Sequence, residues 1–204
     1  TIDIDMLVNF CTFFSMVLRS VMLKPTIKPF CPNFSSGPTK KPDEWSFKKL
    51  NLNYLGRYHR SKSVSEFIEI LLKNLKVVLN IPNSYKIFIS PGSCSGALQS
   101  VIYSLLGNRK ITSIVFDFWG EKWASEINNL DCKQEIRKSM SGSIPSMRNI
   151  PLENDIFFTW VGTSTGMSIK NIEWISNKHE GLIISDITSA VFIEEISWKK
   201  LDAA

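Results

Sequence analysis

The sequence has few of the residues that build metal sites and disulfide frameworks. Its four cysteines include no CxxC pair, and its two histidines are far apart. Both features argue against a Cys/His zinc site and against a disulfide framework. We therefore expect no metal, and we expect reduced thiols in a cytoplasmic protein.

Motifs for nucleic acids, nucleotides and membranes are also missing. Lys and Arg outnumber Asp and Glu by 24 to 19, which gives a net charge of +5, but the charges are scattered. There is no zinc finger, RNP motif or basic helix, and no Walker A or GxGxxG loop, so no nucleic-acid partner is expected. The apolar run Met6–Leu18 is shorter than the roughly 20 residues that cross a bilayer. Asp3 and Asp5 stand where a signal peptide carries basic residues, and we expect no membrane partner.

The composition is that of a soluble globular protein. Of the 204 residues, 44% are hydrophobic and 21% are charged, which allows one domain of ordinary size. We expect residues 1–23 to form an extension of uncertain role outside this domain. An arm follows over 24–62, and its first part, Lys24–Pro42, is too rich in proline for a regular helix or a central strand. The domain itself then covers 63–204.

Short apolar runs alternate with helical patterns along this domain. Helices are predicted from Ser63, where Ser63 and Glu66 form a capping box, from the loop Pro91–Ala97, and over Glu121–Leu130. Asp43–Leu55 has a helical pattern as well. Strands are predicted over Tyr85–Ser90, Ile111–Phe118, Gln134–Lys138, Asp155–Trp160 and Gly181–Ala190. This order predicts an α/β fold with a mainly parallel sheet flanked by helices.

Four of the predicted strands lead into short loops. Their sequences are SCSG, WG, GTSTG and DITS, and all but WG are rich in small polar residues. Parallel strands end at the same edge of a sheet, and ligands bind at that edge. Asp186 stands at one such end, although taken alone it is also explained as a cap of the next turn. We expect a ligand site at this edge of the sheet.

Four segments have side chains suited to an anionic or flat ligand. Pro91–Ala97 leads into a helix, so free N–H groups and the helix dipole favour an anion there. Trp119 either stacks on a flat ligand or is a core aromatic residue. Arg57–Ser61, RYHRS, offers guanidinium groups to phosphate or carboxylate, or forms a solvated basic loop. Asn33–Pro38, NFSSGP, offers hydroxyls and amides, or forms a plain surface turn.

A phosphate cradle, a stacking ring, a hydroxyl donor and a buried carboxylate are what pyridoxal 5'-phosphate requires. The segments that carry a resemblance to a known family are NFSSGP, GR-x-HRS, SCSGA, FWGEKW, TWVGTSTG, DITSA and WKKLD. In these segments the chain resembles the class V aminotransferases of fold type I, and among them the phosphoserine aminotransferases. The resemblance extends from about Lys24 to the end. It implies that 63–204 is part of the large domain that binds pyridoxal phosphate.

The resemblance also implies roles for individual residues. It implies that five residues bind the cofactor: Cys94, Ser95, Trp119, Thr163 and Asp186. Among them, Asp186 is similar to the catalytic partner of the ring nitrogen, and Cys94 and Ser95 to the phosphate site. Trp119 resembles the stacking aromatic residue, and Thr163 the hydrogen-bonding residue near the ring hydroxyl. Three further residues resemble those that bind the phosphate and carboxylate groups of the substrate: Ser36, His59 and Arg60.

The chain departs from the family pattern in three places. Val161 stands where the family usually has Asn, and Tyr58 where it usually has a small residue. No lysine follows DITSA at the place of the Schiff-base lysine, since Lys199 and Lys200 come too early. We therefore expect an N-terminal fragment or an incomplete gene model, cut before the small C-terminal domain and inactive alone.

The resemblance implies a phosphoserine transaminase of L-serine biosynthesis. Such an enzyme moves an amino group between glutamate and 3-phosphohydroxypyruvate, with phosphoserine and 2-oxoglutarate as the other pair, and it is a homodimer. Two alternatives stay open. One is another class V enzyme, such as a serine– or alanine–glyoxylate aminotransferase or a cysteine desulfurase. The other is a non-catalytic α/β module that binds a phosphorylated ligand through SCSGA.

Overall fold

The computed structural model describes residues 26–27, 30, 43–139, 142–169 and 171–204. The contacts between residues divide the chain into two units, Thr1–Leu55 and Gly56–Ala204, and each unit is described by itself. In the first unit, the prediction of a helix over Asp43–Leu55 is wrong, because the structure forms only the 3-10 turn η1 (Phe47–Lys49) there. The Phe47 side chain is 71% exposed. A short helix is marginal in water without a packed apolar face, which explains the error.

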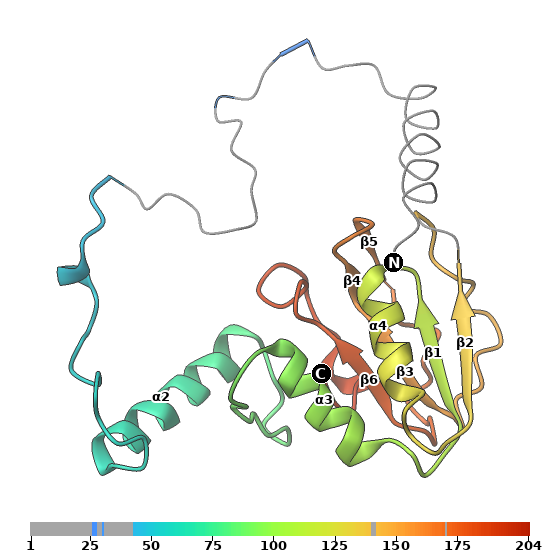
Figure 1. Cartoon of the computed structure of the whole chain (residues 1–204), viewed down its shortest axis with the longest axis horizontal. Helices are drawn as coiled ribbons and strands as arrows, with labels where there is room; N and C mark the ends of the chain where they lie inside the picture. The colour runs from blue at the N-terminus through green and yellow to red at the C-terminus, as the bar shows by residue number, and fades with distance from the viewer. Residues whose placement is uncertain (1–25, 28–29, 31–42, 140–141, 170) are drawn as a thin grey trace, which may run out of the picture. The chain divides into compact units, whose positions relative to one another are not determined.

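A parallel sheet forms the centre of residues 56–204 (Figure 1). Its strands are β1 (Ile111–Val115), β2 (Gln134–Lys138), β3 (Asp155–Thr159) and β6 (Ile183–Asp186). The strand order is β2-β1-β3-β6, and every neighbouring pair is parallel. These four predicted strands are confirmed, and so is the α/β fold class.

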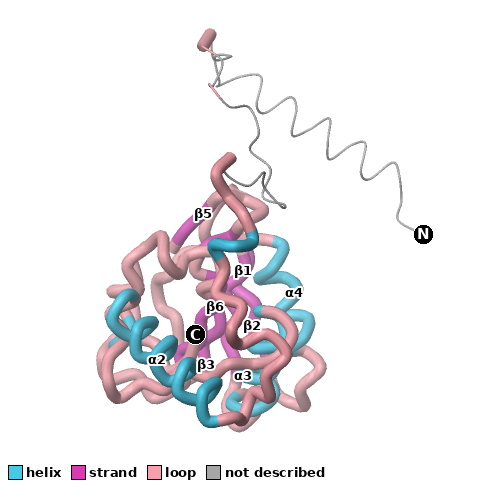
Figure 2. Tube along the Cα trace, turned by 90° about the vertical axis from the view of Figure 1, so that its left-hand side faces the viewer, coloured by secondary structure: helices cyan, strands magenta, loops and turns pink. Residues whose placement is uncertain are grey.

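Helices and a small hairpin surround the sheet (Figure 2). They are α2 (Lys62–Val78), α3 (Cys94–Leu105), α4 (Phe118–Ile127), the hairpin strands β4 (Val161–Gly162) and β5 (Met167–Ser168), and the 3-10 turn η2 (Trp198–Lys200). In the described part of the chain, no helix is both long enough and apolar enough to span a membrane.

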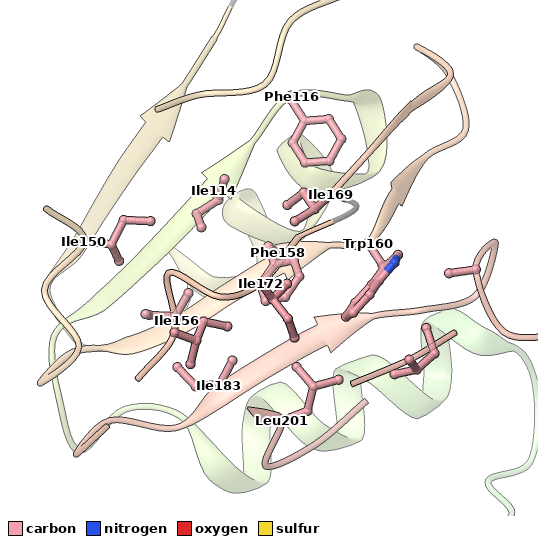
Figure 3. Close-up of a cluster of buried hydrophobic side chains, with 13 residues drawn as sticks. Ile114, Phe116, Ile150, Ile156, Phe158, Trp160, Ile169, Ile172, Ile183 and Leu201 are labelled. Carbon is pink, nitrogen blue, oxygen red and sulfur yellow. The ribbon is translucent and has the colours of Figure 1, made fainter. Parts of the chain in front are cut away.

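Two apolar clusters cover the opposite faces of the sheet. Successive side chains of a strand point to opposite faces, so Phe157 of β3 belongs to one cluster and Ile156 and Phe158 to the other. The Phe157 cluster also holds residues of α3 and α4: Leu98, Ile102, Trp123 and Ile127. The second cluster is closed by loop residues that include Ile169, Ile172 and Leu201 (Figure 3). The helices therefore fix one face of the sheet, and α3 and α4 both start near its carboxyl edge.

Two local predictions before the sheet are wrong: the capping box at Ser63 and the strand over Tyr85–Ser90. The helix predicted from Ser63 is confirmed as α2, but it begins at Lys62 with Ser61 as its N-cap, so Ser63 is inside the helix. The N–H of Ser65 already donates to the Ser61 carbonyl at 2.9 Å, which moves the first turn upstream. Tyr85–Ser90 pairs with no strand in the described residues, and Phe88 is 87% exposed. A strand needs a partner for its N–H and C=O groups, and apolar composition does not supply one.

Candidate functional site

The carboxyl ends of the strands and the start of α3 enclose a pocket of about 180 Å³. The pocket is lined by Cys94, Ser95, Trp119, Trp123, Val161, Thr163, Asp186, Thr188 and Ser189. All five residues predicted to bind the cofactor are in this lining. The parallel sheet explains the meeting, because strands that run the same way bring the loops that follow them to one edge.

Asp186 is the acidic residue of the pocket. It ends β6, whose four residues are all buried, and its own exposed fraction is 9%. The indole N–H of Trp123 donates to Oδ2 at 2.8 Å, and the backbone N–H of Thr188 donates to Oδ1 at 3.0 Å. A carboxylate oxygen accepts up to two hydrogen bonds, so each oxygen can still accept one from a ligand.

The N-terminus of α3 forms a second side of the pocket. Ser93 is its N-cap and accepts a hydrogen bond from the Gly96 N–H at 3.3 Å. Gly92, just before the cap, has a φ of +102°, a conformation that side chains with a Cβ rarely adopt. Cys94 and Ser95 follow in the first turn, where backbone N–H groups have no acceptor inside the helix. These groups and the helix dipole favour an anion at this end of the pocket.

Trp119 lies in the first turn of α4. The helix starts at Phe118, three residues before the predicted Glu121, because the Asp117 side chain caps it and accepts the Gly120 N–H at 2.8 Å. Trp119 stacks on Trp123, with ring centroids 6.4 Å apart and planes at 28°. Trp119 is 36% exposed, whereas Trp123 is 1% exposed. Trp119 is therefore the more accessible indole for a flat ligand.

The β4–β5 hairpin brings Thr163 to the pocket. Thr163 is exposed and lines the pocket beside Val161. The neighbouring Ser164 hydroxyl accepts a hydrogen bond from the Phe118 N–H at 3.0 Å, which ties the hairpin to the start of α4. The hairpin thus holds a hydroxyl donor near the two indoles.

The predicted substrate residues are not part of this pocket lining. His59 and Arg60 are exposed in the turn before α2, and the His59 ring packs edge-on against Tyr58 with centroids 4.9 Å apart. Ser36 lies outside the described residues. Their role in substrate binding stays a prediction.

Sequence reasoning missed Trp123, Thr188 and Ser189 as lining residues. Trp123 follows Trp119 by four positions, and residues four apart share one face of a helix, so the helical period was the signal that pointed to it. Thr188 and Ser189 belong to the DITSA motif, but no pattern in that motif favours them over its other residues.

The lining suits a small, flat, anionic ligand. The pocket volume of about 180 Å³ is smaller than the roughly 300–1,000 Å³ of pockets that hold drug-sized ligands. An anion fits the start of α3, a ring fits against Trp119, and a cationic N–H fits the spare lone pairs of Asp186. Pyridoxal phosphate carries a phosphate, an aromatic ring and a ring nitrogen, so the residues present fit it. Within the described residues, no three His, Cys, Asp or Glu side chains come together to hold a metal ion.

Comparison with known proteins agrees with this geometry. No protein-family model matches the chain. The chain is 36% identical over 182 residues to a phosphoserine aminotransferase of Methanosarcina mazei, a match that covers 88% of this chain and 49% of the relative. The chain thus spans about half the length of the curated relatives it matches. The resemblance to phosphoserine aminotransferases is confirmed.

Solved structures show the same fold. A phosphoserine aminotransferase from Cytophaga hutchinsonii matches with a TM-score of 0.63 and 23% identity, over 72% of this chain and 42% of that one. An alanine–glyoxylate aminotransferase from Nostoc matches with a TM-score of 0.61 and 15% identity, over 71% of this chain and 41% of that one. The chain therefore shares a fold with these two aminotransferases over 72% and 71% of its length.

Proposed function

We propose that this chain, a relative of the phosphoserine aminotransferases in sequence and in fold, holds the cofactor in the phosphoserine aminotransferase reaction. That reaction moves an amino group between glutamate and 3-phosphohydroxypyruvate. One observation carries the proposal: the five residues that the family resemblance assigns to the cofactor line a single pocket around a buried carboxylate. Proteins named for this activity match 88% of the chain.

In this proposal each residue of the pocket has a separate task. Pyridoxal phosphate, when bound, supplies a protonated ring that draws electrons from the substrate. The Asp186 carboxylate holds the proton on the ring nitrogen, because an anion in a buried site favours a positively charged neighbour. Trp119 covers one face of the ring and excludes water from it. Thr163 orients the ring through a hydrogen bond.

The phosphate end is held by the start of α3. The Cys94 and Ser95 N–H groups and the Ser95 hydroxyl would donate hydrogen bonds to the phosphate oxygens, and the helix dipole would add to the attraction. This contact would hold one end of the ligand while Asp186 would hold the other.

Substrate recognition rests on residues outside the pocket lining. We propose that Arg60 and His59, with Ser36, bind the phosphate and carboxylate groups of phosphoserine. Arg presents a planar pair of donors to such groups. The protein is also proposed to work in the cytoplasm, where the free thiols of Cys94 and Cys132 would stay reduced, and as a homodimer, which sedimentation would test.

The test is an amino-transfer assay with added pyridoxal phosphate on the chain joined to the part of the Methanosarcina mazei relative that it does not span, because the chain alone is expected to be inactive. Phosphoserine, serine and alanine are compared as donors, with 2-oxoglutarate as acceptor for the first and glyoxylate for the other two. The proposal expects glutamate to form from phosphoserine, and at least tenfold slower transfer from the others. Preference for alanine or serine would instead support a glyoxylate aminotransferase, since the Nostoc structure matches the fold almost as well.

The role of Asp186 is tested in the same assay. Asp186→Ala removes the carboxylate, so transfer from phosphoserine should fall at least a hundredfold while the circular dichroism spectrum stays that of the wild type. Asp186→Glu is the control, because it keeps the charge and moves it by one methylene. Unchanged transfer in Asp186→Ala would rule out the proposed role.

A further inference from the structure

One hydrogen bond of the pocket joins two separate elements. Trp123 in α4 donates its indole N–H to Oδ2 of Asp186 in β6, at 2.8 Å and out of contact with solvent. We propose that Trp123 is a positioning residue, which fixes the orientation of the Asp186 carboxylate for the ring nitrogen of the cofactor. This inference rests on the proposed function and adds a residue to it.

The two donors to Asp186 do different work. The Thr188 N–H belongs to the loop that directly follows Asp186, so it moves with that residue. The Trp123 N–H comes from another element and fixes the second oxygen independently. A carboxylate with both oxygens held by donors from two elements cannot rotate freely about its Cβ–Cγ bond. Its remaining lone pairs therefore keep a fixed direction in the pocket.

Trp123 is itself held firmly. Its ring lies between Trp119, at 6.4 Å and 28°, and Phe157 of β3, at 6.4 Å and 57°. Its exposed fraction is 1%. The indole N–H is a donor only, so it cannot compete with Asp186 for the proton of the ring nitrogen. Trp123 thus links the ring that stacks on the ligand to the carboxylate that binds the ligand's nitrogen.

A packing role and a positioning role make different demands on Trp123. Packing between two aromatic rings requires the ring of Trp123, but not its N–H group. Trp123→Phe keeps an aromatic ring and removes the N–H. Trp160→Phe is a matched control, because Trp160 is 2% exposed and its indole N–H donates to the Glu194 carboxylate at 2.9 Å, and neither residue lines the pocket.

The experiment measures binding of pyridoxamine 5'-phosphate labelled with 15N in the ring. This probe has the ring and the phosphate but no aldehyde, so its affinity does not depend on any lysine. Loss of the N–H leaves a buried oxygen of Asp186 with one donor fewer, and we expect the dissociation constant of Trp123→Phe to rise about tenfold. The 15N resonance of the bound ring should shift toward that of the unprotonated nitrogen. Trp160→Phe should match the wild type in both measurements.

The possible results separate the two proposals. A wild type that binds no pyridoxamine 5'-phosphate would overturn the proposed function together with this inference. A wild type that binds, with Trp123→Phe unchanged in affinity and in 15N shift, would overturn the inference alone. Equal weakening in Trp123→Phe and Trp160→Phe would also overturn it, since the cause would then be a general loss of stability.

A measurement on the wild type covers the case in which Trp123→Phe does not fold. The indole N–H resonance of Trp123 is followed by NMR in protein labelled with 15N-tryptophan, while pyridoxamine 5'-phosphate is added. The positioning role predicts that this resonance moves on binding, because a third donor to Asp186 weakens the indole hydrogen bond. A resonance that stays in place at saturation would contradict the role.

Discussion

The capping residue of α4 offers a direct test of how the site is supported. Asp117 is 4% exposed, and one of its oxygens, Oδ1, accepts both the Gly120 N–H at 2.8 Å and the Thr159 hydroxyl at 3.0 Å. It therefore joins the start of α4 to the end of β3. Because Trp119 is the second residue of that helix, we expect Asp117→Ala to loosen both the fold and the pocket.

The size of the effect follows from these contacts. Loss of an N-cap side chain costs about 1 kcal/mol of unfolding free energy, and loss of a hydrogen bond to a carboxylate costs about 1.5–3 kcal/mol. The other oxygen of Asp117 is buried and has no partner in the described residues, so its removal returns about 1 kcal/mol. The net loss for Asp117→Ala is then about 2 kcal/mol.

Urea unfolding of the purified protein measures this loss. Asp117→Ser keeps a capping hydroxyl but is too short to reach Thr159, so its comparison with Asp117→Ala isolates the cap. Thr159→Val removes the same hydrogen bond from the other side. Because both variants remove the same hydrogen bond, the losses of Asp117→Ala and Thr159→Val do not add in the double variant, and the shortfall is about 1.5–3 kcal/mol. A loss below about 0.5 kcal/mol in Asp117→Ala, or full additivity, would refute this account.

Two other predictions concern stability. Hydrogen bonds from Lys110 and Arg137, at 2.6 and 3.2 Å, hold the pKa of Glu135 below its ordinary value. The stabilisation from these ion pairs is present above the unfolded pKa of Glu135, and it disappears as pH falls through the folded pKa. Because the Glu135 side chain is 33% exposed, Glu135→Gln should lower the free energy of unfolding by at most about 1 kcal/mol at pH 7. The urea midpoints of the two proteins should converge in acid, and a gap that persists there would contradict the ion pairs. Gly162→Ala would bring a Cβ to 2.8 Å from two neighbouring side-chain atoms, so we expect a loss of about 1–3 kcal/mol. Gly96→Ala, with its nearest atom at 3.4 Å, is the control, and equal urea midpoints for the two variants would argue against crowding at Gly162.

Much of the fold could be predicted because its signals are local. The runs that became β1, β3 and β6 are apolar and short, as buried parallel strands are. The helix α3 followed from apolar residues at helical spacing after a loop of small residues. Tyr85–Ser90 has a similar apolar pattern, but whether it pairs depends on a neighbouring strand that no local pattern encodes.

The candidate site could be predicted from the sequence about as well as the fold. A parallel sheet brings its strand ends to one edge, so placing Asp186, Thr163 and Trp119 near one another required only the order of the elements. Trp123 could not be assigned in this way. Trp123 follows Trp119 by four positions, which indicates that both side chains lie on the same side of a helix. Its hydrogen bond to Asp186, however, depends on how α4 lies across the sheet.

The sequence by itself determined where the four strands of the parallel sheet and the helices α2, α3 and α4 lie along the chain, the loops of small residues after the strands, and the acid at the end of β6. These depend on apolar periodicity and on the chemistry of each residue type, which act over a few positions of the chain. Only the tertiary structure decided which side chains touch: that α4 starts at Phe118, that Ser164 binds that start, and that Trp123 holds Asp186. Such contacts join residues 46 and 63 positions apart, and their geometry is set by the packing of helices and loops against the sheet.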